Sequence, residues 1–279
     1  VVHFYQTGTF TVGNRLVTPE ERAGQASMER TNALTSGHRA CQGCGEALGA
    51  RYAVDAAMRA VNGRLAAANA TGCLEVFSTP YPETSWQLPW FHSLFGNTAA
   101  VATGMAAAFK VKAKKSGGAE TRVIAMGGDG GTTDIGFGCL SGMFERNDDV
   151  LYICYDNEAY MNTGIQRSSS TPRFAKATTS PVGTVIPGKT QNKKNLTDII
   201  AAHNVPYVAQ TTFIGNFRDL YTKAKKAIYT PGPSFLNVMS PCPRGWEYPT
   251  EKLPEICKLA VETCVWPLFE AVSYTHLRA

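Results

Sequence analysis

Short apolar runs that stop at glycine-rich or acidic turns are the clearest pattern in this chain. Residues 122–126 and 150–155 are two such runs, and their length and continuous apolar character predict buried parallel strands. Residues 134–145, between them, leave room for a crossover helix. The pattern therefore predicts a strand, loop, helix, strand unit of the kind found in doubly wound α/β folds.

Periodic apolar positions before and after this unit in the sequence predict further alternating helices and strands. Residues 45–61 have helical spacing, and a second helix is predicted from a cap at Asn97 to about Lys115, ended by Gly117 and Gly118. On the C-terminal side the predicted elements are helices over 196–202 and 217–229 and strands over 206–210 and 234–239. Such alternation favours an α/β fold with a doubly wound, mostly parallel sheet.

Three segments of different character divide the chain. We expect one large α/β domain over residues 35–270, since neither a linker nor an internal repeat interrupts it. Residues 1–34 lack sustained periodicity and are predicted to be an N-terminal arm that packs on a partner. Residues 271–279 do not continue the preceding pattern and resemble translated sequencing-adapter text, so we expect a non-native tail. Within the domain, the polar residues 168–194 predict a long functional loop.

Composition narrows the class of protein. The hydrophobic fraction of 44% and the charged fraction of 18% are those of a globular protein rather than a disordered one. No apolar run is long enough for a membrane span, and the N-terminus lacks the zones of a signal peptide, so a cytoplasmic protein is expected. The net charge of +5 is modest and spread along the chain, which argues against nucleic-acid binding.

Polar residues follow the two central strands at the point where each ends. Asp129 lies in a Gly128-Asp129-Gly130 turn, and Asn157 follows the second strand 28 residues later. Each turn alone is a common tight turn, but the carboxyl ends of parallel strands meet at one edge of a sheet, so the two side chains can share an ion. Carboxylate and amide oxygens suit Mg²⁺, and the glycines would let backbone amides approach a diphosphate.

Eight cysteines in a chain without a secretion signal favour metal ligands over disulfides. Cys41 and Cys44 form a C-x-x-C pair, and Cys73 and Cys242 can complete a set of four. Four thiolates suit zinc or an iron-sulfur cluster, and the absence of a second C-x-x-C pair favours the cluster. Cys139 and Cys154 fall on a predicted helix and strand and are predicted to be small core residues.

These motifs resemble those of the thiamine-diphosphate-binding β subunits of the 2-oxoacid:ferredoxin oxidoreductase family, and most closely those acting on pyruvate. The resemblance spans about residues 35–270 and is carried by Tyr155-Asp156-Asn157-Glu158-Ala159-Tyr160-Met161-Asn162-Thr163-Gly164 and by the segments around the cysteines. It implies the diphosphate-binding module of that family and, as cofactors, thiamine diphosphate, Mg²⁺ and a 4Fe-4S cluster.

The resemblance also implies roles for particular residues. The Mg²⁺ ligands would be Asp129, Asn157 and the carbonyl of Ala159, and the cluster ligands would be Cys41, Cys44, Cys73 and Cys242. Glu46 matches an active-site glutamate, and Asn162 would lie near the substrate carbonyl and the thiazolium ring. The remaining residues expected to contact thiamine diphosphate are Gly45, Gly128, Gly130 and Met161.

The activity that the resemblance implies is oxidative decarboxylation of pyruvate to acetyl-CoA and CO₂, or the reverse synthesis, with electrons passing through the cluster to ferredoxin. Coenzyme A accepts the acyl group. The chain offers one diphosphate module and no evident pyrimidine module, so the resemblance implies an α subunit that supplies it, together with γ and ferredoxin-like δ subunits. The isolated chain is then expected to be inactive.

Three alternatives remain open from the sequence. The same family includes proteins that act on other 2-oxoacids, such as 2-oxoisovalerate, phenylglyoxylate or oxalate. A zinc-stabilised scaffold subunit without redox chemistry would also use four cysteines. Residues 183–190 match the P-loop pattern of nucleotide triphosphatases, but the polar residues on both sides do not predict the strand and helix that a P-loop requires.

Overall fold

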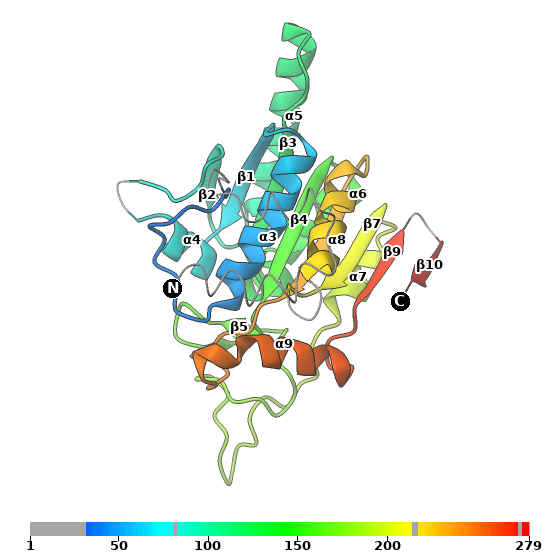
Figure 1. The fold of residues 1–279 in the computed structure, drawn as a ribbon. Coiled ribbons are helices and arrows are strands. Elements are labelled where there is room, and N and C mark those ends of the chain that lie inside the picture. The colour runs from blue at the N-terminus through cyan, green and yellow to red at the C-terminus, as the bar shows by residue number, and fades with distance from the viewer. Residues whose placement is uncertain (1–31, 81–82, 214–216, 273–274, 279) are drawn as a thin grey trace.

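A mostly parallel sheet forms the centre of the fold in the computed structural model, which describes residues 32–80, 83–213, 217–272 and 275–278 (Figure 1). In this part of the chain the sheet order is β10-β9-β7-β8-β4-β3-β1-β2. The parallel strands are β1 (Leu65–Ala70), β2 (Trp90–Ser93), β3 (Arg122–Gly128), β4 (Val150–Asp156), β7 (Tyr207–Thr211) and β8 (Ser234–Met239). Strands β9 (Phe269–Val272) and β10 (Thr275–Arg278) extend it antiparallel, and β5 (Ala159–Tyr160) pairs apart with β6 (Gln166–Arg167).

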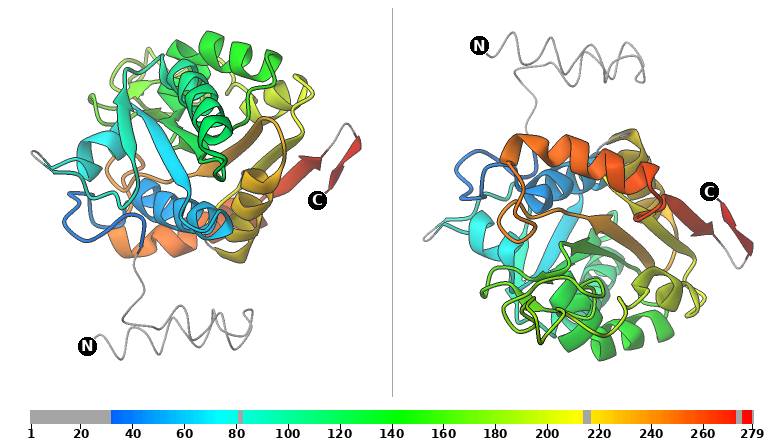
Figure 2. Two further views of the ribbon diagram at one scale, coloured as in Figure 1. Left: turned by 90° about the horizontal axis from the view of Figure 1, so that it is seen from above. Right: turned by 90° about the horizontal axis from the view of Figure 1, so that it is seen from below.

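Helices cover both faces of this sheet, as the end-on views show (Figure 2). One face is packed by α3 (Gly45–Ala60), α4 (Cys73–Ser78), α8 (Phe217–Tyr229) and α9 (Leu253–Glu262). The other is packed by α5 (Thr98–Ser116), α6 (Phe137–Glu145) and α7 (Leu196–Ala201). The predicted doubly wound α/β class is therefore confirmed.

The two central strands explain why the core divides into two layers. Ile124 and Met126 of β3 face the α3 side, whereas Val123 and Ala125 face the α5 side. Successive side chains of a strand point to opposite faces, so an uninterrupted apolar run is what a strand buried on both faces requires. This is the physical reason that the runs at β3 and β4 predict buried strands correctly.

The register of these strands fixes where their polar ends meet. Gly128, at the end of β3, pairs with Tyr155 of β4, and Asp156 pairs with Met239 of β8. Asp129 and Asn157 each follow directly, so they emerge at the same edge of the sheet. The predicted common edge is confirmed.

Helix ends agree with the sequence in some respects and differ in others. Gly117 ends α5 in a left-handed conformation with φ 65°, as a terminal glycine permits, and Asn97 stands at the cap position without a side-chain hydrogen bond. The segment 134–145 is not one helix, because a π-helical turn, Gly130–Ile135, precedes α6. Strand β1 and helices α4 and α9 were not predicted. The alanine-rich sequence of β1 lacks the β-branched residues that indicate a strand.

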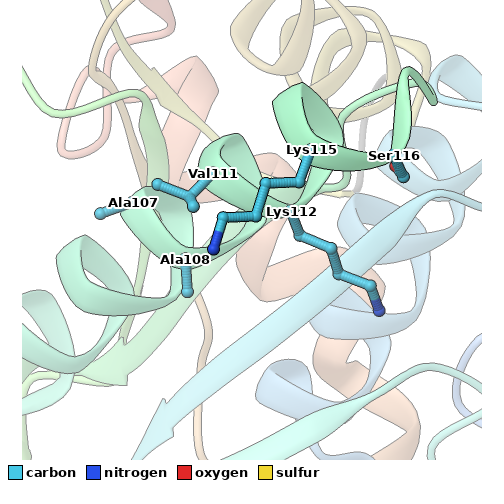
Figure 3. Close-up of a pocket in the computed structure, with 6 residues that line it drawn as sticks. All are labelled: Ala107, Ala108, Val111, Lys112, Lys115 and Ser116. Carbon is cyan, nitrogen blue, oxygen red and sulfur yellow. The ribbon is translucent and has the colours of Figure 1, made fainter.

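Helix α5 reaches beyond the sheet at the end of the molecule opposite the long loop (Figure 1). A shallow surface hollow on its last turns is lined by Val111, Lys112, Lys115 and neighbouring small residues (Figure 3). Among the described residues, no helix is both long enough and apolar enough to span a membrane.

The structure describes only parts of the predicted N-terminal arm and C-terminal tail. Ala33 and Leu34, the last residues of the predicted arm, pack in the core beside α3, whereas residues 1–31 lie outside the described part. Residues 269–272 and 275–278 form the terminal hairpin of the sheet. Whether residues 271–279 are native stays a prediction.

Candidate cofactor and metal site

The carboxyl edge of β3 and β4 brings Asp129 and Asn157 into direct contact. The backbone N–H of Asn157 donates to Asp129 Oδ1 at 3.3 Å, although 28 residues separate them in the chain. Both residues are buried. The geometry therefore allows one ion to contact both side chains, as the strand pattern predicts.

The Asp129 carboxyl group is buried without enough nearby positive charge to stabilise its ionised form. Its side chain is completely buried, and its Oδ2 accepts a short hydrogen bond from the Ser168 hydroxyl. Burial, followed by the neighbouring Asp156 carboxylate, raises the pKa of Asp129 well above its ordinary value. A divalent cation beside a carboxylate reverses this effect, because it stabilises the ionised form. The environment of Asp129 thus suits a cation ligand.

Near Asp129, the side-chain oxygen of Asn157 has no hydrogen-bond partner. Its Nδ2 donates to Glu46 Oε2 at 3.2 Å, whereas its Oδ1 is buried and accepts no hydrogen bond. A buried unsatisfied acceptor costs about 1–3 kcal/mol, which a ligand can recover. Amide oxygens are ligands for hard cations such as Mg²⁺. The unpaired Oδ1 and the buried Asp129 together fit a Mg²⁺ site.

Glu46 lies under the site in the first turn of α3. Its carboxylate accepts hydrogen bonds from the Leu74 N–H at 3.2 Å and from Asn157, and it is only 3% exposed. Burial raises the pKa of Glu46 to about 7, against the opposing effect of these two hydrogen bonds. A carboxyl group with that pKa can hold or release a proton near neutral pH.

A pocket opens above these residues. Eight residues predicted from the sequence line it: Glu46, Cys73, Gly128, Gly130, Asn157, Ala159, Met161 and Asn162. Thr71, Phe95, Gly131 and Tyr160 also line it, and the sequence predicted no role for them; Tyr160 stands in the motif that carries the resemblance, but only its neighbours were assigned contacts. The predicted ligand Asp129 and the predicted contact residue Gly45 are buried and are not among the residues that line the pocket, although Gly45 is the neighbour of Glu46 in the chain.

Three glycines near this edge serve different purposes. A Cβ on Gly45 would lie 2.7 Å from the backbone of Pro241, so Gly45 permits close packing of α3 against the end of β8. The α-carbon of Gly130 lies against the Tyr160 ring, whose hydroxyl donates to the Gly130 carbonyl at 3.0 Å. By contrast, a Cβ on Gly128 would meet nothing nearer than 4.0 Å. Open space in front of Gly128 is what a close ligand requires.

The four predicted cluster cysteines are free thiols close to this pocket. Cys73 lines the pocket itself and begins α4. Burial raises the pKa of Cys44 to about 12, and burial likewise raises the pKa of Cys73, which Glu46 and the other three cysteines raise further. Thiolates that disfavour each other's ionisation in this way need a nearby positive charge.

Backbone N–H groups already point at two of these sulfurs. Cys44 Sγ accepts from Ala47 N–H at 3.4 Å, and Cys242 Sγ accepts from Gly245 N–H at 3.4 Å. Such hydrogen bonds and a set of four thiols match the donor chemistry of an iron-sulfur cluster. Within the described residues, no three His, Cys, Asp or Glu side chains gather closely enough to hold one metal ion.

Trp246 connects the region of Cys242 to the turn at Asn157. Its Nε1 donates to the Asn157 carbonyl at 2.9 Å, and its backbone N–H donates to the Cys242 carbonyl at 2.9 Å. Met161 lies beside it, with its thioether against Gly245. The two candidate sites are therefore neighbours that share a wall, and no sequence motif indicated this role of Trp246.

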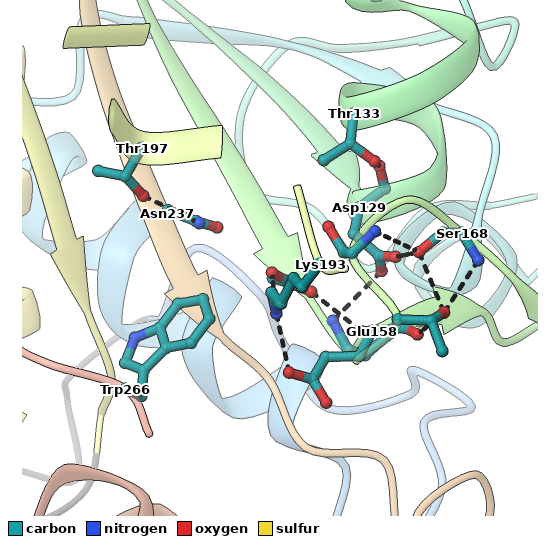
Figure 4. A network of polar contacts seen from close by, with 12 residues as sticks. Asp129, Thr133, Glu158, Ser168, Lys193, Thr197, Asn237 and Trp266 are labelled. Atoms are coloured by element: carbon teal, nitrogen blue, oxygen red, sulfur yellow. Dashed lines mark hydrogen bonds and ion pairs between the residues drawn. The ribbon is translucent and has the colours of Figure 1, made fainter. Parts of the chain in front are cut away.

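The long loop over residues 168–194 contains no helix. Its two ends lie at the same edge of the sheet, with Ser168 beside Asp129 and Lys193 beside Glu158 (Figure 4). Ser168 bonds Asp129, and the Ser169 N–H donates to Asp134 at 2.9 Å. Lys189 is buried, and its ammonium donates to the carbonyl of Ser169 at 3.0 Å. Lys189 is the lysine of the P-loop pattern, and no helix begins there because α7 starts only at Leu196. Its ammonium stabilises the loop.

Comparison with known proteins gives a consistent result. Residues 70–238 match the family described as thiamine pyrophosphate enzyme, C-terminal TPP binding domain. The chain is 52% identical over 237 residues to pyruvate synthase subunit PorB of Methanosarcina barkeri, covering 85% of this chain and 77% of that protein. It is 53% identical over 244 residues to PorB of Methanocaldococcus jannaschii, covering 86% and 80%.

The names of more distant relatives refer to other 2-oxoacids. Ketoisovalerate oxidoreductase subunit VorB of Pyrococcus abyssi is 44% identical over 253 residues, covering 90% of this chain and 80% of that protein. Among solved structures, 2-oxoglutarate:ferredoxin oxidoreductase from Magnetococcus marinus superposes with a TM-score of 0.63 at 27% identity, covering 78% of this chain and 70% of that one.

Proposed function

The chain belongs to the PorB family of pyruvate synthase subunits, within the thiamine pyrophosphate enzymes, and we propose that it is the subunit of a pyruvate:ferredoxin oxidoreductase that binds both thiamine diphosphate and a 4Fe-4S cluster. The observation that carries the proposal is the position of Cys73. This predicted cluster ligand lines the same pocket as Asn157 and Asn162. Electrons leaving the cofactor would therefore have an acceptor beside it.

Mg²⁺ would be held by Asp129, by Asn157 Oδ1 and by the carbonyl of Ala159. The support is the buried, uncompensated carboxylate of Asp129 and the unpaired amide oxygen of Asn157. The metal would fix the diphosphate of the cofactor at the open face of Gly128.

The cluster would be held by Cys41, Cys44, Cys73 and Cys242. The support is that all four are free thiols, that Cys73 lines the pocket and is affected electrostatically by the other three, and that N–H groups point at two of the sulfurs. Hydrogen bonds to cluster sulfurs help to set the reduction potential.

Thiamine diphosphate, when bound, supplies the nucleophilic carbon and the electron sink that decarboxylation of a 2-oxoacid requires. The protein orients it and excludes water. Glu46 fixes the orientation of Asn157 and can hold a proton near neutral pH, since burial raises its pKa to about 7. Asn162 lines the pocket, which supports the proposal that it would lie near the substrate carbonyl and donate a hydrogen bond to it.

Pyruvate is the proposed substrate because the PorB proteins share about half of their residues with this chain, whereas VorB shares 44%. Coenzyme A would accept the acyl group, and ferredoxin would carry the electrons away. Since the relatives are named as subunits, we propose an assembly in which an α subunit supplies the pyrimidine-side domain, with γ and ferredoxin-like δ subunits.

Anaerobic purification of the complex, followed by assays of ferredoxin reduction with coenzyme A and a panel of 2-oxoacids, tests this function. Pyruvate should support a higher kcat/KM than 2-oxoisovalerate or 2-oxoglutarate. Iron and sulfide in the β subunit should accompany the activity. Zinc in place of iron, with no reduction of ferredoxin, would instead favour the scaffold alternative.

A further inference from the structure

A half-buried lysine lies between the acidic residues next to the proposed metal ligands. Lys193 Nζ lies 2.9 Å from Asp156 Oδ2 and 2.8 Å from Glu158 Oε1 (Figure 4). Asp156 and Glu158 flank Asn157, and Glu158 precedes Ala159. Lys193 comes from the far end of the long loop, so it joins two segments that are distant in the sequence. Neither the family motifs nor the strand pattern indicated it.

The turn that Lys193 holds is conformationally demanding. Glu158 has φ 68°, a left-handed conformation that a residue with a Cβ adopts at a cost. The Glu158 N–H donates to Asp156 Oδ1 at 3.0 Å, and the Glu158 carbonyl accepts a short hydrogen bond from the Thr171 hydroxyl. The turn is therefore kept in place by its surroundings. This conformation directs Asn157 and Ala159 to the pocket.

Packing fixes the ammonium itself. Lys193 Nζ lies 4.9 Å from the centre of the Trp266 ring, a distance at which a cation is attracted to the ring face. Trp266 is 3% exposed, and its Nε1 donates to the Thr211 carbonyl at 2.9 Å, so it is anchored to the end of β7. Lys193 is thus held from both sides, by carboxylates and by an aromatic ring.

We infer that Lys193 is a positioning residue for the divalent cation: by pairing with Asp156 and Glu158 it holds the Asp156–Ala159 turn so that Asn157 Oδ1 and the Ala159 carbonyl face the metal. This inference rests on the proposed function, since it assumes a cation at Asp129 and Asn157. Removing a residue that orients a metal ligand commonly lowers the metal affinity by about 10–100-fold.

Electrostatics alone predicts the opposite effect, which makes the inference testable. A cation near the metal repels it, so replacing Lys193 by an uncharged residue should tighten metal binding if only charge matters. If Lys193 acts by holding the turn, the same replacement should weaken binding. The sign of the change therefore separates the two explanations.

The test measures Mn²⁺ binding by electron paramagnetic resonance of the free ion, using the assembled complex with thiamine diphosphate. Lys193→Met should raise the Mn²⁺ Kd about tenfold or more. The matched control is Lys176→Met, which removes a lysine of the same loop whose ion pair with Glu247 is exposed, and should leave the Kd unchanged.

A second variant covers the case in which Lys193→Met does not fold. The double variant Lys193→Met with Glu158→Gln keeps the wild-type net charge of the turn, so charge alone predicts an unchanged Kd, whereas loss of positioning predicts a Kd that is again raised about tenfold. An unchanged or lower Kd in folded variants overturns the inference. If the wild-type complex binds no Mn²⁺, the proposed function fails first, and the inference fails with it.

Discussion

The side-chain amide of Asn157 donates from Nδ2 to Glu46 Oε2 at 3.2 Å, which turns its Oδ1 to a place without any hydrogen-bond partner. Glu46 lies in the first turn of helix α3, and Asn157 follows strand β4, 111 residues away. One amide thus links the proposed active-site glutamate to the proposed metal site. A change at either residue should affect the other.

Removal of the Asn157 amide should abolish cofactor retention. Asn157→Ala deletes a proposed metal ligand and leaves Glu46 with one hydrogen bond fewer. We expect the purified complex to lose most of its thiamine diphosphate at Mg²⁺ concentrations that saturate the wild type, measured by chromatography of the extracted cofactor. Asn195→Ala changes an exposed asparagine before α7 and should retain the wild-type content. Full retention by Asn157→Ala would contradict the metal assignment.

Cys73 should be essential for the cluster. Cys73→Ser removes a thiolate at the pocket wall, so we expect loss of iron and sulfide from the anaerobically purified subunit and loss of pyruvate-dependent ferredoxin reduction. Cys264 is exposed and free, so Cys264→Ser is the matched control and should keep the full iron content. Equal iron in the two variants would show that Cys73 is not a ligand.

The isolated chain should be inactive. With the cluster restored in its oxidised form, and with thiamine diphosphate, Mg²⁺, coenzyme A and oxidised ferredoxin supplied, we expect no oxidation of pyruvate until the α subunit is added. The reason is that the pyrimidine-side domain is proposed to come from that subunit. Stopped-assay measurement of acetyl-CoA checks this. Turnover by the chain alone would refute the proposed division between subunits.

Glu270 should stabilise the far edge of the sheet in a pH-dependent manner. Burial opposes its ionisation, but hydrogen bonds from Lys226 and Tyr207 outweigh burial and lower the pKa of Glu270. Its contribution is therefore present above the ordinary glutamate pKa and is lost as the pH falls through the lowered value. Glu270→Gln should reduce the free energy of unfolding by roughly 1 kcal/mol at pH 7.

Urea unfolding at several pH values measures this effect. The difference between wild type and Glu270→Gln should vanish in acid, where both side chains are neutral. Glu255→Gln removes a partner of an exposed ion pair with Lys252 and should change little at any pH. A difference between wild type and Glu270→Gln that is independent of pH would mean that lost packing, not lost charge, explains the destabilisation.

The sequence predicts the part of the site that lies in continuous segments. The runs at β3 and β4 are apolar because both faces are buried, and this pattern places Asp129 and Asn157 at one edge of the sheet. Cysteine spacing likewise identifies Cys41 and Cys44. These inferences need only local periodicity and the geometry of parallel strands.

Contacts between distant segments could not be predicted in this way. The pairing of Lys193 with Asp156, and of Trp246 with the Asn157 carbonyl, depends on how two loops fold against the sheet. Nothing in the local sequence of either loop specifies its partner. Gly45 packs closely against Pro241, a requirement of the fold that the motif alone did not reveal. Its expected cofactor contact stays a prediction.

The most direct test of the account is a crystal structure of the anaerobically purified complex with thiamine diphosphate, with anomalous data collected at the iron edge. The account predicts an iron peak enclosed by the sulfurs of Cys41, Cys44, Cys73 and Cys242, and a Mg²⁺ ion in contact with Asp129 and Asn157. Iron located elsewhere, or cysteines without metal beside a bound cofactor, would contradict it.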